Sequence, residues 1–271
     1  MNDQEFLPPH PGSVLLHAGT YRRVLPVSLE RLYENALDWE HLPHLHHGSF
    51  VSVQCLGAGA RGWRAAVTHV NGRDSVLELT LERDCRRWIT RTTEGFGAGS
   101  EIWTHAFPVT GERVDIVVDF FIPEPDEGRR TELGRAYGDY YARLYDEDVA
   151  MMTERQRQLD RRIDRARDHA RTLVLGQRDA LALPMNIVLG GREFVLAEVE
   201  GCLAAFPRQC PHQLGPLSAE HLEGRVVTCP WHGDRFDVLS GANLSGRGCR
   251  LEQLPRIQVN DTGRVELTAC H

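Results

Sequence analysis

The chain has 271 residues, a formal net charge of −7 and a pI near 6.0. This length predicts two domains of ordinary size, and the negative charge argues against nucleic acid and anionic membranes as partners. No run approaches the roughly 18 apolar residues that a membrane span needs, and the first residues lack the basic and apolar regions of a secretion signal. We therefore expect a cytoplasmic protein.

Residues 28–43 favour a helix, with Ser28 as its N-cap and Pro43 as its end. From 49 to 122 the pattern changes to β-rich runs separated by glycine-rich turns, which predicts a six-stranded antiparallel meander. Residues 57–62 (GAGARG) fit a dinucleotide-binding pattern, but a strand-like run follows them, so we expect a hairpin turn. No nicotinamide or flavin site is therefore expected.

A long charged helix is expected over residues 132–171. A short helix, a curved sheet and a long C-terminal helix are the plan of the helix-grip fold, in which the sheet wraps the helix around an apolar cavity. The remaining residues are again β-rich and punctuated by Gly and Pro. The predicted fold class is α+β, with a helix-grip (START/Bet v 1-like) domain at 13–171 and an all-β domain at 172–271.

The strongest motif is C-x-H, a sixteen-residue spacer and C-x-x-H, formed by Cys210, His212, Cys229 and His232. Two thiolates can hold one iron of a [2Fe-2S] cluster while two imidazoles hold the other. Each half-motif brings one residue of each kind to the tip of a loop. A zinc knuckle, or unrelated buried Cys and His residues, is the alternative.

The flanking sequences CPHQLGPLS and CPWHGDRFDVLSG resemble the Rieske family of ferredoxins and oxygenases. The resemblance covers about residues 172–271 and implies a [2Fe-2S] cluster. Respiratory-complex members of the family carry an extra Cys in each loop, where this chain has Gly215 and Trp231. The match is therefore to the ferredoxin and oxygenase branch.

A second motif, D-x-x-H-x-x-x-x-H, is formed by Asp38, His41 and His46. Two such imidazoles and one carboxylate from elsewhere make the facial triad of non-haem Fe(II) sites, although a plain His-rich loop is the alternative. ENALDWEHLPHLH resembles the mononuclear-iron motif of Rieske non-haem iron oxygenases. The resemblance implies that His41 and His46 bind iron and that Asp38 bridges the cluster of one subunit to the iron of its neighbour. His44 and His47 have no counterpart in that motif.

The third iron ligand is expected on the long helix, which offers Asp146, Glu147 and Asp148. Only Asp148 lies on the apolar stripe of this helix, where a charge is costly unless it is paired or bound to metal. The stretch DEDVAMMTERQ also resembles the family segment that completes the triad. Asp148 is therefore the expected ligand, Asp146 the reserve, and a solvated helix face the alternative.

These resemblances imply a terminal oxygenase component that activates O2 at mononuclear Fe(II) with electrons from the Rieske cluster. The expected reaction is hydroxylation, dihydroxylation or demethylation of a small apolar or aromatic substrate, and the motifs do not choose among the three. A separate ferredoxin or flavin reductase is the expected electron donor, and a homotrimer is the expected assembly. The C-terminal place of the Rieske part and the short first domain depart from the family. Two alternatives are a Rieske ferredoxin-like carrier fused to a helix-grip module without catalytic iron, and a metal-regulated binding protein with zinc at HLPHLHH.

Overall fold

The computed structural model describes residues 14–164 and 171–270. The N-terminal residues on which the absence of a secretion signal was predicted lie largely outside the described residues. The last residues of the helix predicted over 132–171 also lie outside them. Two compact units are present, Met1–Thr153 and Glu154–His271. In the described part of the chain, no helix is long and apolar enough to cross a membrane.

The division between the units falls inside helix α3 (Glu127–Asp164), earlier than the expected boundary after residue 171. The last turns of α3 are bound to the second unit. Arg155 donates to the Gln213 carbonyl oxygen at 3.0 Å, and Gln209 donates to the Gln158 side chain at 2.8 Å. These contacts place the C-terminal part of the helix with the second unit.

The first unit contains an antiparallel sheet of seven strands in the order β1-β7-β6-β5-β4-β3-β2. The strands are β1 (Leu16–Leu25), β2 (Phe50–Gly59), β3 (Gly62–His69), β4 (Asp74–Glu82), β5 (Arg87–Gly95), β6 (Glu101–Thr110) and β7 (Arg113–Ile122). The expected meander is β2 to β7, and the expected hairpin at 57–62 is confirmed by the pairing of Gly59 with Gly62. Strand β1 is not predicted by the sequence pattern, and it pairs with β7 from Leu16 opposite Ile122 to Leu25 opposite Val114.

The single helix predicted over 28–43 is two helices, α1 (Leu29–Leu37) and α2 (Leu42–Leu45). Ser28 caps α1 as expected, because its Oγ accepts from the Arg31 backbone N–H at 3.3 Å. Pro43, however, lies in the first turn of α2 and does not end a helix. Proline is tolerated there because the N–H it lacks has no partner within a helix.

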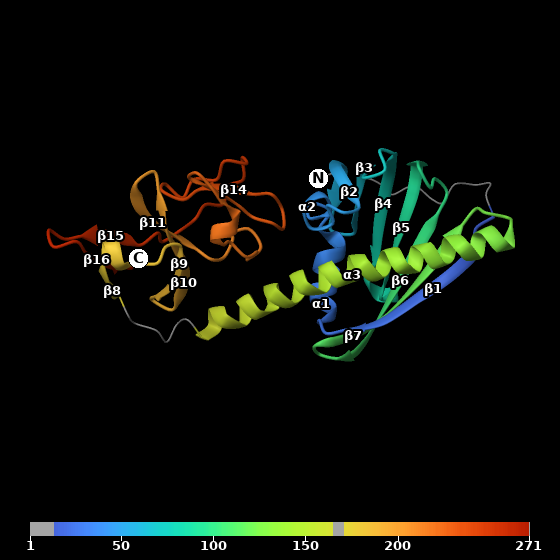
Figure 1. Cartoon of the computed structure of the whole chain (residues 1–271). Coiled ribbons are helices and arrows are strands. Elements are labelled where there is room, and N and C mark those ends of the chain that lie inside the picture. Colours follow the sequence, from blue (N-terminus) through green and yellow to red (C-terminus); the bar gives the residue numbers. More distant parts are fainter. Residues whose placement is uncertain (1–13, 165–170, 271) are drawn as a thin grey trace. The chain divides into compact units, whose positions relative to one another are not determined.

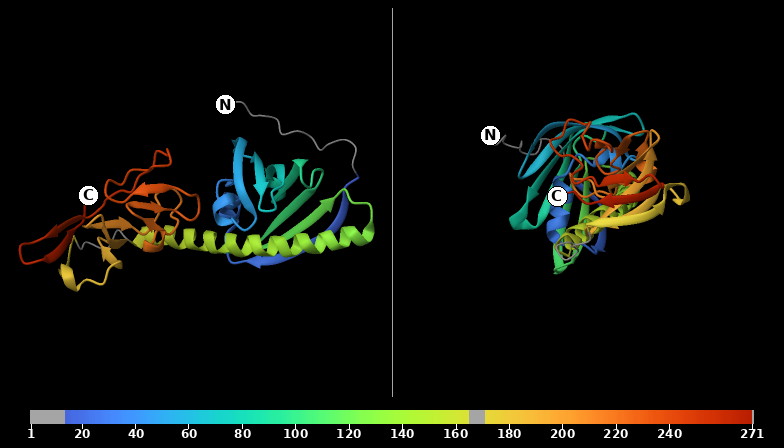
Figure 2. Two further views of the ribbon diagram at one scale, coloured as in Figure 1. Left: turned by 45° about the horizontal axis from the view of Figure 1, so that its top comes forward. Right: turned by 90° about the vertical axis from the view of Figure 1, so that its left-hand side faces the viewer.

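Helix α3 lies along the curved face of the sheet, as Figures 1 and 2 show. Tyr137 of the helix stacks on Phe120 of β7 with ring centroids 5.3 Å apart, and Tyr145 and Met152 are buried in the same core. A cluster of large apolar residues fills the space between the sheet, α1 and α3, including Leu25, Leu32, Trp63, Trp88, Ile116 and Val118. The first unit therefore has the helix-grip fold.

The second unit is all-β apart from the end of α3 and two short 3₁₀ turns, within the residues that the structure describes. Its strands are β8 (Thr172–Gln177), β9 (Met185–Leu189), β10 (Arg192–Val199), β11 (Cys202–Pro207), β12 (Leu222–Glu223), β13 (Val226–Thr228), β14 (Arg235–Asp237), β15 (Arg256–Val259) and β16 (Arg264–Thr268). They form three sheets of three strands, ordered β11-β10-β9, β12-β13-β14 and β15-β16-β8. A separate apolar core of Ile187, Phe194, Leu196, Val265 and Leu267 supports them. The expected all-β domain is confirmed.

Candidate metal centres

Two loops of the second unit, residues 210–215 and 229–234, carry the Cys and His residues of the first motif, and we call them the cluster loops. Each is closed by the same pair of backbone hydrogen bonds. Cys210 N–H donates to the Gly215 carbonyl and Leu214 N–H donates to the Cys210 carbonyl. In the second loop, the Cys229 N–H donates to the Asp234 carbonyl and the Gly233 N–H donates to the Cys229 carbonyl. The two half-motifs therefore have the same pattern of backbone hydrogen bonds.

Both cysteines of the cluster loops are buried, with 0% and 1% of Cys210 and Cys229 exposed. The two thiols contact each other, and the hydrogen bond from Cys210 lowers the pKa of Cys229 to about 5. The same bond raises the pKa of Cys210, with burial as the second cause. Cysteine binds metal as the thiolate, and the lowered pKa of Cys229 favours that form in the cluster loops.

The imidazoles of His212 and His232 face each other with ring centroids 4.6 Å apart. His232 is buried, whereas the His212 side chain keeps 21% of its surface exposed. The space around the sulfurs is tight: a Cβ added at Gly215 would lie 2.8 Å from the Cys229 Sγ and 3.0 Å from the Trp231 ring. Two sulfurs and two imidazoles in one small pocket fit the donor set of a Rieske cluster.

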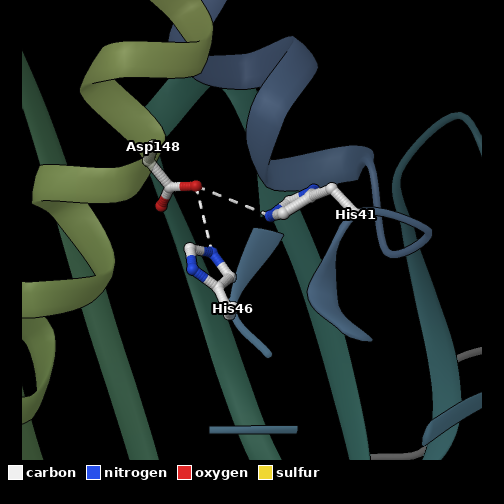
Figure 3. A group of neighbouring side chains, drawn as sticks. All are labelled: His41, His46 and Asp148. Carbon is white, nitrogen blue, oxygen red and sulfur yellow. Dashed lines mark ion pairs between the residues drawn. The ribbon is translucent and has the colours of Figure 1, made fainter. Parts of the chain in front are cut away.

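The second motif meets the long helix in the first unit. His41 and His46 flank the one-turn helix α2, at its N-cap and C-cap, and Asp148 projects from α3. The Asp148 Oδ1 lies 3.5 Å from His41 Nε2 and 3.1 Å from His46 Nε2 (Figure 3). One ligand atom from each of the three residues lies within 4.8 Å of the others. We call these three residues the His–His–Asp site.

All three side chains of the His–His–Asp site are buried, at 3%, 2% and 8% exposure for His41, His46 and Asp148. Burial opposes the ionised form of Asp148, but its hydrogen bond with His46, the charges of both histidines and a hydrogen bond from Asn35 together lower its pKa. The Asn35 amide donates to Asp148 Oδ1 at 3.0 Å. Burial likewise opposes protonation of His46, yet the two nearby carboxylates raise its pKa.

Each imidazole of the His–His–Asp site also faces a second carboxylate through its other ring nitrogen. The His46 Nδ1 lies 2.5 Å from Glu147 Oε2, and the His41 Nδ1 lies 3.8 Å from Asp38 Oδ2. Such outer carboxylates orient metal-binding imidazoles and fix the tautomer. In the sequence, Glu147 is only a less favoured ligand candidate than Asp148, and Asn35 is not a candidate at all. The contact of Glu147 with His46 was not visible in its spacing.

Three other candidate residues lie away from the His–His–Asp site, and a fourth, Asp38, lies beside it. Asp146, the reserve ligand, has 66% of its side chain exposed and pairs with Arg23 at 2.5 Å. His44 and His47 are both exposed, and the Nδ1 of His47 contacts the His44 carbonyl oxygen at 3.2 Å. Asp38 is buried beside His41, and its bridging role between subunits stays a prediction.

The His–His–Asp site lines a cavity of about 490 Å³ in the first unit. This volume lies in the range of small-molecule sites. The lining is mainly aromatic and aliphatic, and includes Phe50, Trp63, Leu77, Trp88, Ile102 and Tyr141. Polar groups gather at the His–His–Asp site and in a few further positions such as Ser75, Thr90 and Thr92. The cavity is therefore mainly apolar, with ionisable groups at the His–His–Asp site and at His69 and Arg143.

Comparison with known proteins places the second unit. The Rieske [2Fe-2S] domain family matches residues 171–255. The ferredoxin component of the naphthalene 1,2-dioxygenase system of Pseudomonas aeruginosa is 44% identical over 73 residues, which cover 24% of this chain and 70% of that protein. The chain belongs to the Rieske [2Fe-2S] family. Against the corresponding ferredoxin component of Pseudomonas putida, identity is 40% over 60 residues, and this Rieske chain spans 58% of that protein's length.

Solved structures are similar to the other half of this Rieske chain. Norcoclaurine synthase from Thalictrum flavum covers 56% of the chain and 98% of its own length, with 15% identity and a TM-score of 0.41. The Zhui aromatase/cyclase from Streptomyces sp. R1128 covers 52% of the chain, with 12% identity and a TM-score of 0.43. At this level of likeness, no activity is carried over from either protein.

The interpretation as a terminal oxygenase component is wrong in view of these relatives. The curated proteins that the chain resembles are ferredoxin components of dioxygenase systems and not oxygenase subunits. The oxygenase prediction rests on the D-x-x-H-x-x-x-x-H motif. That motif fixes a set of candidate ligands but not the direction in which electrons flow. The ferredoxin-like alternative is supported better.

Proposed function

We propose that this chain is an electron carrier of the Rieske ferredoxin type, joined to a helix-grip domain that binds a small apolar ligand. The likeness to ferredoxin components carries the proposal. The partial exposure of His212, at 21% of its side chain, supports it, because this imidazole offers an electron a short route between a cluster and a partner surface. By analogy with those relatives, a reductase supplies the electron and an oxygenase component receives it.

Electron transfer by the purified, full-length chain tests this proposal. We expect the protein to hold two cluster irons, to accept one electron per cluster from a flavin reductase with NADH, and to pass it to an acceptor such as cytochrome c. Cys229→Ser should abolish both steps, whereas Cys202→Ser, at an exposed cysteine outside the cluster loops, should change neither. A cluster that is present but cannot be reduced by any reductase would refute the carrier role.

We further propose that the His–His–Asp site binds one divalent transition metal, with Fe(II) as the expected ion and Zn(II) as the competitor. Two imidazoles and one carboxylate, each already oriented by a neighbour, fit the donor set of such a site. A metal bound there could polarise a ligand in the cavity. Metal analysis should give a third equivalent per chain, lost in His41→Ala and kept in His44→Ala, its exposed neighbour.

The ligand of the cavity is proposed to be a small, largely apolar molecule, aromatic in the first instance, because aromatic and aliphatic side chains dominate the lining. Quenching of tryptophan fluorescence by a panel of aromatic compounds tests this, since Trp63 and Trp88 both line the cavity. With the same preparation, the rate of O2 consumption measured with an oxygen electrode tests the carrier proposal. A carrier consumes O2 only by slow oxidation of its reduced cluster. A homotrimer stays a prediction that sedimentation of the purified protein measures.

A further inference from the structure

Asp234 is a buried carboxylate in the cluster loop 229–234 that neither motif includes. Only 1% of its side chain is exposed. Its backbone closes the loop, since its carbonyl oxygen accepts from the Cys229 N–H at 2.8 Å. A carboxylate so fully buried is costly unless a cation or another partner compensates for its charge. The partners of Asp234 are therefore informative.

The two carboxylate oxygens of Asp234 point to different groups. Oδ2 lies 3.2 Å from His212 Nδ1, and Oδ1 forms an ion pair with Arg247 Nε at 2.7 Å. Arg247 lies on the segment after β14 and keeps 30% of its side chain exposed. Asn243 holds this segment, because its Oδ1 accepts from the Arg247 backbone N–H at 3.3 Å. A line of three groups thus runs from a partly exposed cation, through a buried anion, to a cluster histidine.

We infer that the charges of the Asp234–Arg247 pair set the reduction potential of the cluster. Reduction adds one negative charge to the pocket between the cluster loops. A fixed carboxylate beside His212 disfavours that charge, and the guanidinium behind it favours it. Because Asp234 is buried and Arg247 is partly hydrated, each charge acts with a different strength, and neither cancels the other. The inference rests on the cluster and not on the use that the protein makes of its electron.

The two charges predict opposite shifts, which a merely structural role would not produce. In Asp234→Asn, the cation remains without its anion, so the potential should rise. In Arg247→Gln, the buried anion remains without its cation, so the potential should fall. We expect each shift to change the equilibrium constant for reduction at least tenfold, which is about 59 mV for a one-electron couple. The double variant should return toward the wild-type potential, because both charges are then absent.

The experiment is a redox titration of the full-length, cluster-loaded protein, followed by electron paramagnetic resonance. Arg225→Gln is the matched control, because Arg225 forms an ion pair with Asp237 at 2.5 Å in the same unit, and its described ion pairs are with Asp237 and Glu200 and not with Asp234. It should leave the potential unchanged within a factor of two in the equilibrium constant. Iron content and the line shape of the signal show whether each variant holds an intact cluster.

If Asp234→Asn does not assemble a cluster, Arg247→Gln and Arg247→Lys still test the inference. Lysine keeps the charge, so Arg247→Lys should stay near the wild-type potential while Arg247→Gln falls. Shifts of the two single variants in the same direction, or shifts below threefold in the equilibrium constant for both, would overturn it. Those outcomes leave the carrier role untouched, since electron transfer to cytochrome c is measured separately.

Discussion

At the scale of single residues, the first unit surrounds two histidines with more carboxylates than a metal needs. Asp148 faces both His41 and His46, and Glu147 and Asp38 face their other ring nitrogens. The adjacent acids of α3 therefore have separate tasks. Asp148 points into the buried site, Glu147 supports His46 from its half-exposed position, and Asp146 pairs with Arg23 at the surface.

Glu147→Gln should weaken metal binding at the His–His–Asp site without abolishing it. The amide cannot hold His46 as the carboxylate does, and the loss of such an outer partner typically lowers metal affinity by about 10- to 100-fold. Asp146→Asn is the control, because it removes a neighbouring charge of the same helix that does not touch the site. Competition with a chromophoric chelator measures both affinities. Equal affinities for Glu147→Gln and wild type would show that the contact with His46 has no such role.

The metal-free His–His–Asp site should stabilise the fold most between about pH 4 and pH 6.5, the ordinary pKa values of its acid and its imidazoles. The pKa of Asp148 is lowered, so its contribution is present above its ordinary pKa and is lost as the pH falls through the lowered value. The pKa of His46 is raised, so its contribution is full below its ordinary pKa and is lost as the pH rises through the raised value.

A divalent metal replaces the protons on this site, so its effect on the melting temperature should be larger at pH 8 than at pH 6. As the pH rises through the raised pKa of His46, the metal has to displace fewer protons from this imidazole, so binding costs less. Thermal melts with and without metal, after removal of adventitious ions, check this. His46→Ala should lose the metal effect at both pH values. A metal effect that is larger at pH 6 would contradict the assignment of His46 as a ligand.

At the scale of elements, the position of α3 on the sheet depends on a glycine. A Cβ at Gly134 would lie 2.0 Å from the Ala18 carbonyl oxygen of β1, whereas a Cβ at Gly138, one turn later, would meet nothing within 4 Å. Gly134→Ala should therefore destabilise the first unit by about 1–3 kcal/mol through overpacking. Gly138→Ala should stabilise it by up to about 1 kcal/mol, because alanine favours the helix. Chemical denaturation measures the free energy of unfolding of both variants. Equal effects would show that α3 is not in tight contact with β1 at Gly134.

The elements that the sequence predicted well are those with strong local patterns. The residues of strands β2 to β7 form β-rich runs that are separated by glycine-rich turns, and α3 carries an apolar stripe. The missed strand β1 contains Arg22 and Arg23 side by side, and its pairing with β7 joins residues about a hundred positions apart, which no local pattern records. The role of Pro43 was misjudged for a related reason: a proline ends a helix or begins one, and only the chain geometry after Asp38 decides which.

At the scale of the whole molecule, the residues of both candidate metal sites could be predicted from the sequence, but the function could not. The C-x-H and C-x-x-H motifs predict a [2Fe-2S] cluster at Cys210, His212, Cys229 and His232. The fold also brings together the predicted residues His41, His46 and Asp148. Their supporting partners lie far away in sequence, as Asn35 does from Asp148 and Arg247 does from His212, so no spacing could reveal them. The direction of electron flow depends on partner surfaces, which leave no motif.

The two units have separate cores, so loss of one metal centre should spare the other. Cys229→Ser removes a buried sulfur ligand, and because cluster binding contributes to the stability of the fold around it, the second unit should unfold at a lower temperature. Metal affinity at the His–His–Asp site should stay within about twofold of wild type. Conversely, His41→Ala should keep the visible absorption of the cluster while losing the third metal. Calorimetry together with metal analysis measures both variants. Loss of metal from both centres in either single variant would show that the two units fold as one cooperative structure.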